Sequence, residues 1–92
     1  MEVSNDIKRK FDIINALSKV ERPTLSYLQH ETDIPESTLK RQLAAIRACF
    51  GMRILFVREP DGNRGAVGYY ILADWGVIDR DEFFKFYIKS MV

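Results

Sequence analysis

The stretch that most restricts the fold lies in the middle of the chain, at residues 36–50, ESTLKRQLAAIRACF. Its large apolar side chains recur at steps of four, three and four, the spacing of one helical stripe: Leu39, Leu43, Ile46 and Phe50. At about 100° per residue, the opposite face carries a second set, called the outward face below: Ser37, Arg41, Ala44, Ala45 and Ala48. The stretch therefore predicts a helix with one apolar stripe and one face of small and cationic side chains.

The chemistry of the outward face favours a DNA-recognition helix. Long side chains hold a groove or partner at a distance, whereas alanine and serine allow close approach. Lys40 and Arg47 flank one side of the apolar stripe, and Thr38 and Gln42 flank the other. The alternative is an ordinary core-packing helix with a solvated polar face, because amphipathic helices are common. The neighbouring segments distinguish a DNA-recognition helix from a core-packing helix.

The preceding segment reads as a second helix and a tight turn. Thr24 is placed to cap a short helix at about 25–31, and residues 32–34 form the turn. Pro35 suits the entry to the next helix, where its missing backbone N–H costs nothing. Ser37 and Thr38 follow in the first turn, where free N–H groups can hold a phosphate. The whole segment 24–50 therefore predicts helix, turn, helix.

The following segment predicts a β-hairpin, called the wing below (residues 52–73). Gly51 ends the helix, and two runs rich in β-branched and aromatic residues follow, at 52–58 and 69–74. Between them lies a linker rich in glycine, proline, aspartate and asparagine, which is typical of a turn. Arg58 and Arg64 lie at or near its tip. Taken alone, the segment could be an ordinary hairpin whose charged end serves solubility.

Two further helices complete the expected fold. The first covers about 5–20, capped by Ser4 or Asn5, and the last covers about 80–90 behind Asp79. The 92 residues suffice for one small domain, 1–92. We expect a mainly α fold with a β-hairpin: a three-helix core, a two-stranded wing and a C-terminal helix.

Charge and composition limit the possible functions. The net charge is only +1, although residues 36–64 hold six cations and three acids, which gives +3. Strong nucleic-acid binders usually carry a larger positive excess. Apolar runs stay well short of the ~20 residues of a membrane span, and the start MEVSNDIKRK is too polar for a signal peptide. We expect a cytoplasmic protein with no membrane partner.

The chain offers little for catalysis or metal binding. The single Cys49 excludes an internal disulfide, and its place near the end of an apolar helix predicts a buried structural thiol rather than a reactive one. His30 has no ligand partner at metal-binding spacing, so a solvent-facing or hydrogen-bonded histidine is expected. No nucleophile elbow or phosphate-binding glycine loop is found. We expect no enzyme activity, no metal and no cofactor.

The last helix is more aromatic than the closure of a small core requires. We expect it to form a homodimer interface, helped by the first helix, with Phe83, Phe84, Phe86 and Tyr87 in the contact. The alternative is that all of these rings fill the core of one chain.

The segment Ile34-Pro35-Glu36-Ser37-Thr38-Leu39-Lys40-Arg41 resembles the turn and recognition helix of bacterial winged helix-turn-helix regulators, notably the IclR-type DNA-binding domain. The chain is also similar to small, stand-alone winged-helix proteins of bacteria. The resemblance implies a transcription regulator of double-stranded DNA. Residues expected to contact the DNA are Ser37, Thr38, Lys40, Arg41, Arg47, Arg58 and Arg64. A winged-helix module that binds a protein partner, without strong DNA binding, remains the alternative, because fold does not imply function.

Overall fold

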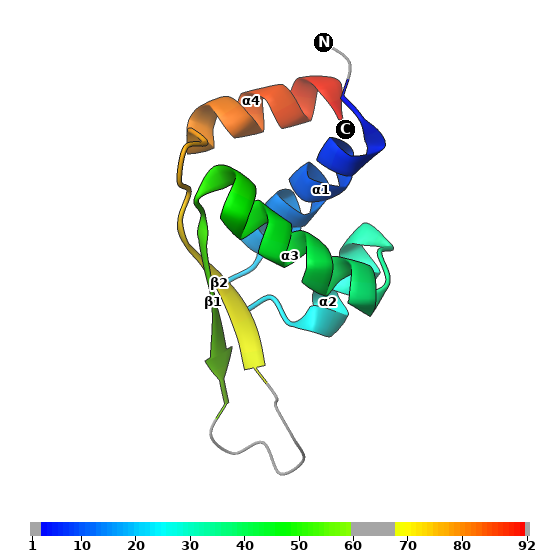
Figure 1. Ribbon diagram of the computed structural model, residues 1–92, viewed down its shortest axis with the longest axis vertical. Coiled ribbons are helices and arrows are strands. Elements are labelled where there is room, and N and C mark those ends of the chain that lie inside the picture. The colour runs from blue at the N-terminus through cyan, green and yellow to red at the C-terminus, as the bar shows by residue number, and fades with distance from the viewer. Residues whose placement is uncertain (1–2, 60–67, 92) are drawn as a thin grey trace.

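The computed structural model describes residues 3–59 and 68–91, and Figure 1 shows their arrangement. Arg64 and the rest of the expected wing tip lie outside the described residues. The elements follow in this order: α1 (Asn5–Lys19), α2 (Leu25–Thr32), α3 (Glu36–Phe50), β1 (Arg53–Arg58), β2 (Gly68–Asp74) and α4 (Arg80–Ser90). This confirms the expected order of three helices, a hairpin and a last helix, and the bounds agree to within one residue.

The first three helices pack around one apolar core. Their innermost side chains are almost completely buried and come from all three helices: Ile13, Ile14, Leu17, Leu28, Leu39, Leu43 and Ile46. Each helix begins at a defined residue. Ser4 accepts a hydrogen bond from the N–H of Ile7, and Thr24 accepts one from Tyr27, so two N-termini are capped as the sequence predicted. The apolar stripe of residues 36–50 is thereby the inner face of α3.

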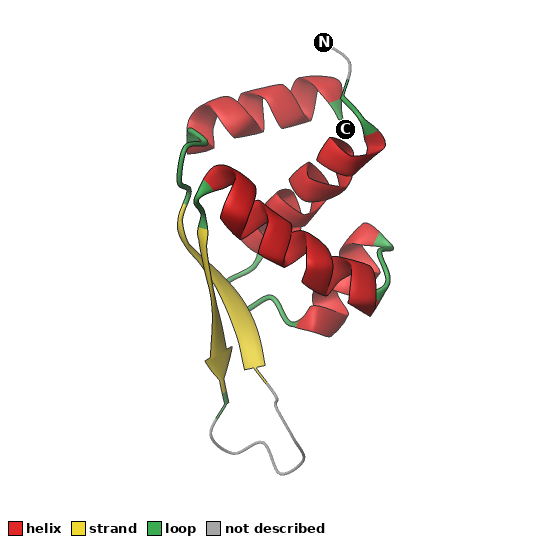
Figure 2. Ribbon diagram, viewed as in Figure 1, coloured by secondary structure: helices red, strands yellow, loops and turns green. Residues whose placement is uncertain are grey.

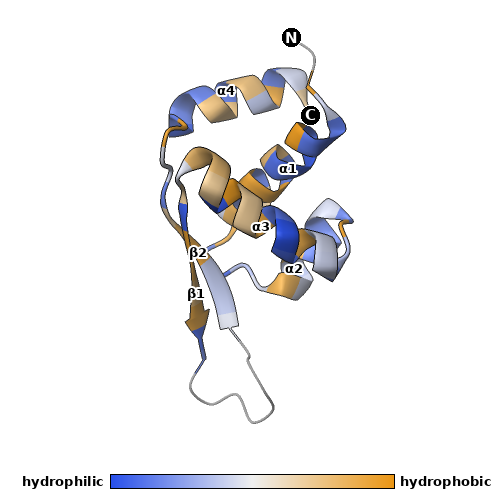
Figure 3. Cartoon of the chain, viewed as in Figure 1, coloured by the Kyte–Doolittle hydropathy of each residue, from blue (hydrophilic) through white to orange (hydrophobic). Residues whose placement is uncertain are grey.

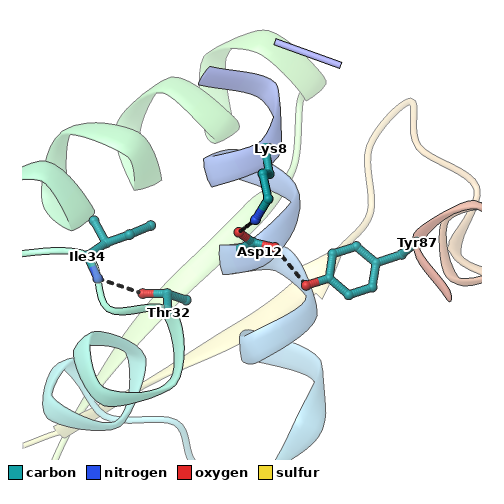
Figure 4. A network of polar contacts seen from close by, with 5 residues as sticks. All are labelled: Lys8, Asp12, Thr32, Ile34 and Tyr87. Carbon is teal, nitrogen blue, oxygen red and sulfur yellow. Dashed lines mark hydrogen bonds and ion pairs between the residues drawn. The ribbon is translucent and has the colours of Figure 1, made fainter. Parts of the chain in front are cut away.

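The turn between α2 and α3 is fixed by its own hydrogen bonds. Asp33 takes the left-handed conformation at φ 59°, and its N–H bonds to the carbonyl of Gln29. Thr32 donates to the carbonyl of Leu28 and accepts from the N–H of Ile34, a contact drawn in Figure 4. The Ile34 side chain is buried below this turn. These contacts set the angle at which α3 leaves α2.

The hairpin projects away from the helices, as Figure 2 shows in yellow. Gly51 ends α3 at φ 67°, and its N–H bonds to the carbonyl of Arg47. β1 and β2 pair antiparallel, with Phe56 opposite Tyr70 and an irregularity between Arg53 and Ile54. The N–H of Tyr70 donates to the carbonyl of Pro23 at 2.8 Å. This bond attaches the sheet to the loop between α1 and α2.

The helix α4 closes the end of the core opposite the hairpin (Figure 1). Asp79 caps it by accepting from the N–H of Glu82, as expected. The Tyr87 hydroxyl donates to Asp12 of α1 at 2.7 Å, and Lys8 pairs with the same carboxylate (Figure 4). Burial and this carboxylate raise the pKa of the Tyr87 hydroxyl, which therefore stays protonated as the donor.

The structure corrects the expected use of the aromatic residues in α4. Phe83 and Tyr87 are only 4% and 9% exposed, because they fill the core of the single chain, so they offer almost no surface to a second copy. Trp75 packs on Phe83 and Phe84 of α4. Phe84 and Phe86 remain half-buried. The monomer-core alternative thus holds for half of the predicted contact set.

Cys49 corrects a second expectation. The sequence predicted a buried thiol, but the side chain is exposed on α3. The apolar stripe passes through Ile46 and Phe50. Cys49 lies about 100° around the helix axis from Phe50, so its side chain points away from the core.

Among the described residues, no helix combines the length and apolar character that a membrane crossing requires.

Candidate nucleic-acid interface

The outward face of α3 is open to solvent. Ser37, Arg41, Ala44 and Ala48 are exposed and Ala45 is half-buried, so the predicted division into two faces is correct. In Figure 3 the early part of α3 is strongly hydrophilic and the later part is pale to moderately apolar. Lys40 and Arg41 lie in this first half of α3. The small side chains continue the same face toward its end.

Lys40 and Arg41 differ in their charge partners. Lys40 Nζ pairs with Glu36 at 3.1 Å, an exposed contact one helical turn apart. Such a pair contributes little free energy, about 0.3–0.5 kcal/mol, so it is easily exchanged for another anion. Arg41 is exposed and makes no ion pair with any described residue. Its guanidinium is thus available to a base edge or a phosphate without breaking an internal contact.

Arg47 was also predicted to contact DNA, but it has a structural partner. Its Nε and Nη2 atoms both donate to the carbonyl oxygen of Ile54, at 3.0 and 2.8 Å. This two-pronged contact joins the last turn of α3 to the first part of the hairpin. The sequence does not predict this contact. Arg47 and Ile54 are seven residues apart, on either side of Gly51, and they meet only because β1 folds back beside the helix.

Gln42 is the clearest departure from the expected pattern. The sequence placed it on the polar flank, yet the residue is only 3% exposed. Its Nε2 donates to Asp6 of α1 at 2.8 Å, and its Oε1 has no hydrogen-bond partner among the described residues. Asp6 also binds Lys10, which is itself buried. The Lys10 hydrogen bond, followed by that of Gln42, lowers the pKa of the Asp6 carboxyl.

No sequence pattern predicts the cluster of Asp6, Lys10 and Gln42. Asp6 and Lys10 are four residues apart, a spacing that permits a helical ion pair, but nothing in the sequence links them to a glutamine in α3. Their role is to join α1 to α3. Gln42 and Arg47 are therefore structural, and Thr38 is half-buried. Of the α3 residues expected to contact DNA, this leaves Ser37, Lys40 and Arg41 accessible and without a structural role.

A hollow of about 540 Å³ separates the first part of α3 from the hairpin. It is lined from three directions, by the start of α2, by α3 and by both strands: Thr24, Leu25, Ser26, Lys40, Phe56, Gly68 and Tyr70. Arg58 is exposed at the end of β1, on the same face of the sheet as Phe56. The hollow thus brings a helix start, a lysine and the hairpin to one surface.

This surface brings together features that a nucleic-acid contact requires. It combines a protruding helix with small side chains, a neighbouring hairpin and three accessible cations: Lys40, Arg41 and Arg58. Residues 3–59 and 68–91 contain no group of three histidine, cysteine or acidic side chains that could hold a metal ion. His30 is exposed on α2.

Comparisons with known proteins agree with this geometry. A family model described as winged helix-turn helix matches residues 2–87. A solved structure of a DUF2131 family protein from Shewanella amazonensis SB2B is similar, with a TM-score of 0.74 and 28% identity. That match covers 95% of this chain and 89% of the other. The search of curated proteins gave no significant match.

Proposed function

The chain belongs to the winged helix-turn-helix family, because the family model covers nearly all of it, and we propose that it binds double-stranded DNA as a sequence-specific transcription regulator. The fold is typically non-catalytic, which agrees with the surface described above. The observation that carries the proposal is Arg41, which is exposed on an outward face of small side chains and makes no ion pair with any described residue. The likeness of residues 34–41 to the IclR-type domain supports the same function.

In the proposed complex α3 enters the major groove with its first turns. Ser37 and Arg41 face base edges, while the exchangeable Lys40 moves from Glu36 to a phosphate. Arg58 contacts the backbone beside the groove, and Arg64 is proposed to do the same. Arg47 keeps its bond to Ile54 and acts by fixing the angle between α3 and the wing.

Selection of bound duplexes from a random pool tests this function. An enriched sequence motif is expected, and binding to the selected site should weaken steeply with salt, because phosphate contacts release counterions. A pool that yields no motif, together with binding that hardly depends on salt, would refute the proposal. Heat-denatured protein, carried through the same selection, controls for non-specific retention.

We also propose that the regulator acts as a homodimer through the outer side of α4. Ile88 is 67% exposed, and Val77, just before the helix, is 80% exposed. The ring of Phe86 packs edge-on against the ring of Phe11, with 6.0 Å between the ring centroids, and is only half-buried. A two-fold dimer would double the phosphate contacts of a weakly charged domain and read two half-sites about 34 Å apart.

The dimer proposal is tested by sedimentation with an Ile88→Glu variant. A buried carboxylate at a two-fold contact is costly, so the variant should dissociate while its circular dichroism stays native. Val20→Glu is the matched control, since Val20 is also an exposed aliphatic residue but lies at the end of α1. If the two variants associate equally, this side of α4 is not the dimer contact.

A protein-interaction module is the second candidate function. The small net charge of +1 and the exposed aliphatic side chains at Val77 and Ile88 favour it. It predicts weak binding to every duplex with the same low salt dependence. The salt titration described above therefore distinguishes the two functions directly.

A further inference from the structure

Phe56 on β1 is an exposed aromatic residue whose ring is held in a fixed position. The residue is 41% exposed although it lies inside a strand. Its ring packs against the ring of Tyr70 on β2, with 5.0 Å between the ring centroids. The same ring lies against Gly68, where a Cβ atom would come within 2.7 Å of Phe56 Cζ and 2.3 Å of the carbonyl oxygen of Val57. A larger residue than glycine therefore does not fit beside the ring.

The Phe56 ring borders the hollow between α3 and the hairpin. The side chains around this hollow are of two kinds. Lys40, Thr24 and Ser26 supply an ammonium group and two hydroxyl groups, whereas Phe56 and Tyr70 supply aromatic rings. The hollow therefore offers polar groups from the helical side and aromatic rings from the hairpin.

The geometry of the proposed complex determines what passes through this hollow. With α3 in the major groove and the hairpin beside it on the backbone, the DNA strand that borders the groove runs between the two elements. Such a strand alternates charged phosphates with sugar rings. The phosphates match Lys40 and the hydroxyl groups. The sugar, whose C2′ carbon carries only hydrogen in DNA, is the part of the strand that matches an aromatic ring.

We propose that Phe56 packs on one deoxyribose of the bound strand and selects DNA against RNA at that nucleotide. The ring covers the C2′ carbon, which bears a hydroxyl group in RNA. A 2′-hydroxyl held against the ring loses its contact with water and gains no partner, which is unfavourable. The inference rests on the DNA binding proposed above, and it adds the identity of the sugar and the residue that recognises it.

The neighbouring residue in β1 provides the contrast. Leu55 is 42% exposed, nearly the same fraction as Phe56, but it lies on the opposite face of the sheet, because successive side chains of a strand alternate. It is not among the residues that line the hollow. Loss of an exposed apolar side chain from β1 is therefore common to variants of both residues, whereas loss of the sugar contact is specific to Phe56.

A single ribonucleotide, moved along each strand of the selected duplex, locates the contact. Fluorescence anisotropy gives the dissociation constant for each position. At the nucleotide beside Phe56 the 2′-hydroxyl should raise the dissociation constant about tenfold, as expected for an unpaired buried hydroxyl. A 2′-fluoro nucleotide at the same position should bind nearly as tightly as the deoxynucleotide. It shares the sugar pucker of the ribonucleotide but has no O–H group, so it separates the hydroxyl from a change in duplex shape.

Substitutions in β1 connect this penalty to the ring. In Phe56→Ser the penalty should disappear, because water and the serine hydroxyl can reach the 2′-hydroxyl. Phe56→Leu stays apolar and should keep part of the penalty, and Leu55→Ser, the matched control, should keep all of it. Hydrogen exchange of the Tyr70 N–H, which bonds to the carbonyl of Pro23, reports whether the hairpin keeps its place in each variant.

Two results would overturn the inference. One is a duplex in which no ribonucleotide weakens binding more than its 2′-fluoro counterpart. The other is a penalty that persists unchanged in Phe56→Ser with the hairpin in place. Both results leave the proposed function intact, because the selected all-DNA duplex is still bound. Failure to bind any duplex would instead remove the proposed function and this inference together.

Discussion

Arg41 and Arg47 lie six residues apart on α3, and both are exposed arginines beside alanines. Arg41 makes no ion pair with a described residue, whereas Arg47 binds the Ile54 carbonyl through two nitrogens. The first half of α3 thus keeps its cation available, and the second half uses its cation to hold the hairpin. If α3 binds DNA as proposed, the comparison teaches that its arginines serve the complex in two ways: by contact with DNA, or by fixing the angle of the neighbouring hairpin.

Replacement of the unpaired arginine should have the largest effect. Arg41→Ala is expected to weaken binding to the selected site by about 1–3 kcal/mol, the contribution of a good base contact. Its free energy of unfolding should be unchanged, because no internal contact is lost. Fluorescence anisotropy with the selected duplex measures the first quantity and urea unfolding the second. Unchanged affinity in a folded variant would remove Arg41 from the interface.

The bonded arginine should give the opposite result. Arg47→Ala is expected to lower the free energy of unfolding by about 1–2 kcal/mol, since hydrogen bonds from a charged group to a carbonyl are lost. Arg47→Lys is the informative companion variant: it keeps the charge but cannot donate from two nitrogens. If Arg47→Lys were as stable as the parent while losing DNA affinity, the division between the two halves of α3 would be wrong.

Removal of a cation at the wing tip should have a smaller effect on DNA affinity, and this effect should not depend on the DNA sequence. Arg64→Ala should lower affinity for all duplexes alike and reduce the slope of log affinity against log salt by roughly one unit, as expected for one lost phosphate contact. Titration of a selected and an unrelated duplex at several salt concentrations measures both. A loss confined to the selected duplex would indicate base recognition by the wing instead.

The hydrogen bond from Gln42 of α3 to Asp6 of α1 should respond to pH, and this effect should be the smallest. The pKa of Asp6 is lowered by Lys10 and Gln42, so its ionised form is bound more tightly in the folded chain. The stabilisation is present above the ordinary aspartate pKa of 3.8 and is lost as the pH falls through the lower folded value. Asp6→Asn should flatten the acid limb of a stability–pH profile. An identical acid limb in the variant would show that Asp6 does not contribute to it.

The bounds of the helices followed from the sequence because their signals are local. Caps at Ser4, Thr24 and Asp79, a stop at Gly51 and the apolar stripe of α3 each involve residues within a few positions of one another. The division of α3 into two faces followed from the same periodicity. These features do not depend on which element packs where.

Apart from Cys49, the errors concern contacts between distant segments. Gln42 is buried because Asp6 and Lys10 of another helix meet it there, and Phe83 and Tyr87 are buried because Phe11 and Asp12 lie opposite them. Periodicity tells which side of a helix is apolar, but not how much of that side its own chain covers. The role of Arg47 was missed for the same reason.

The bond between Tyr87 and Asp12 spans 75 residues, and its consequence reaches into the synthesis of the protein. α1 is made well before Phe83 and Tyr87, the rings that complete its burial. On the ribosome the apolar side of α1 therefore stays partly uncovered until residues 83–87 have emerged. Loss of α4 through a premature stop codon would leave that surface exposed permanently and make the truncated product a target for chaperones and proteases.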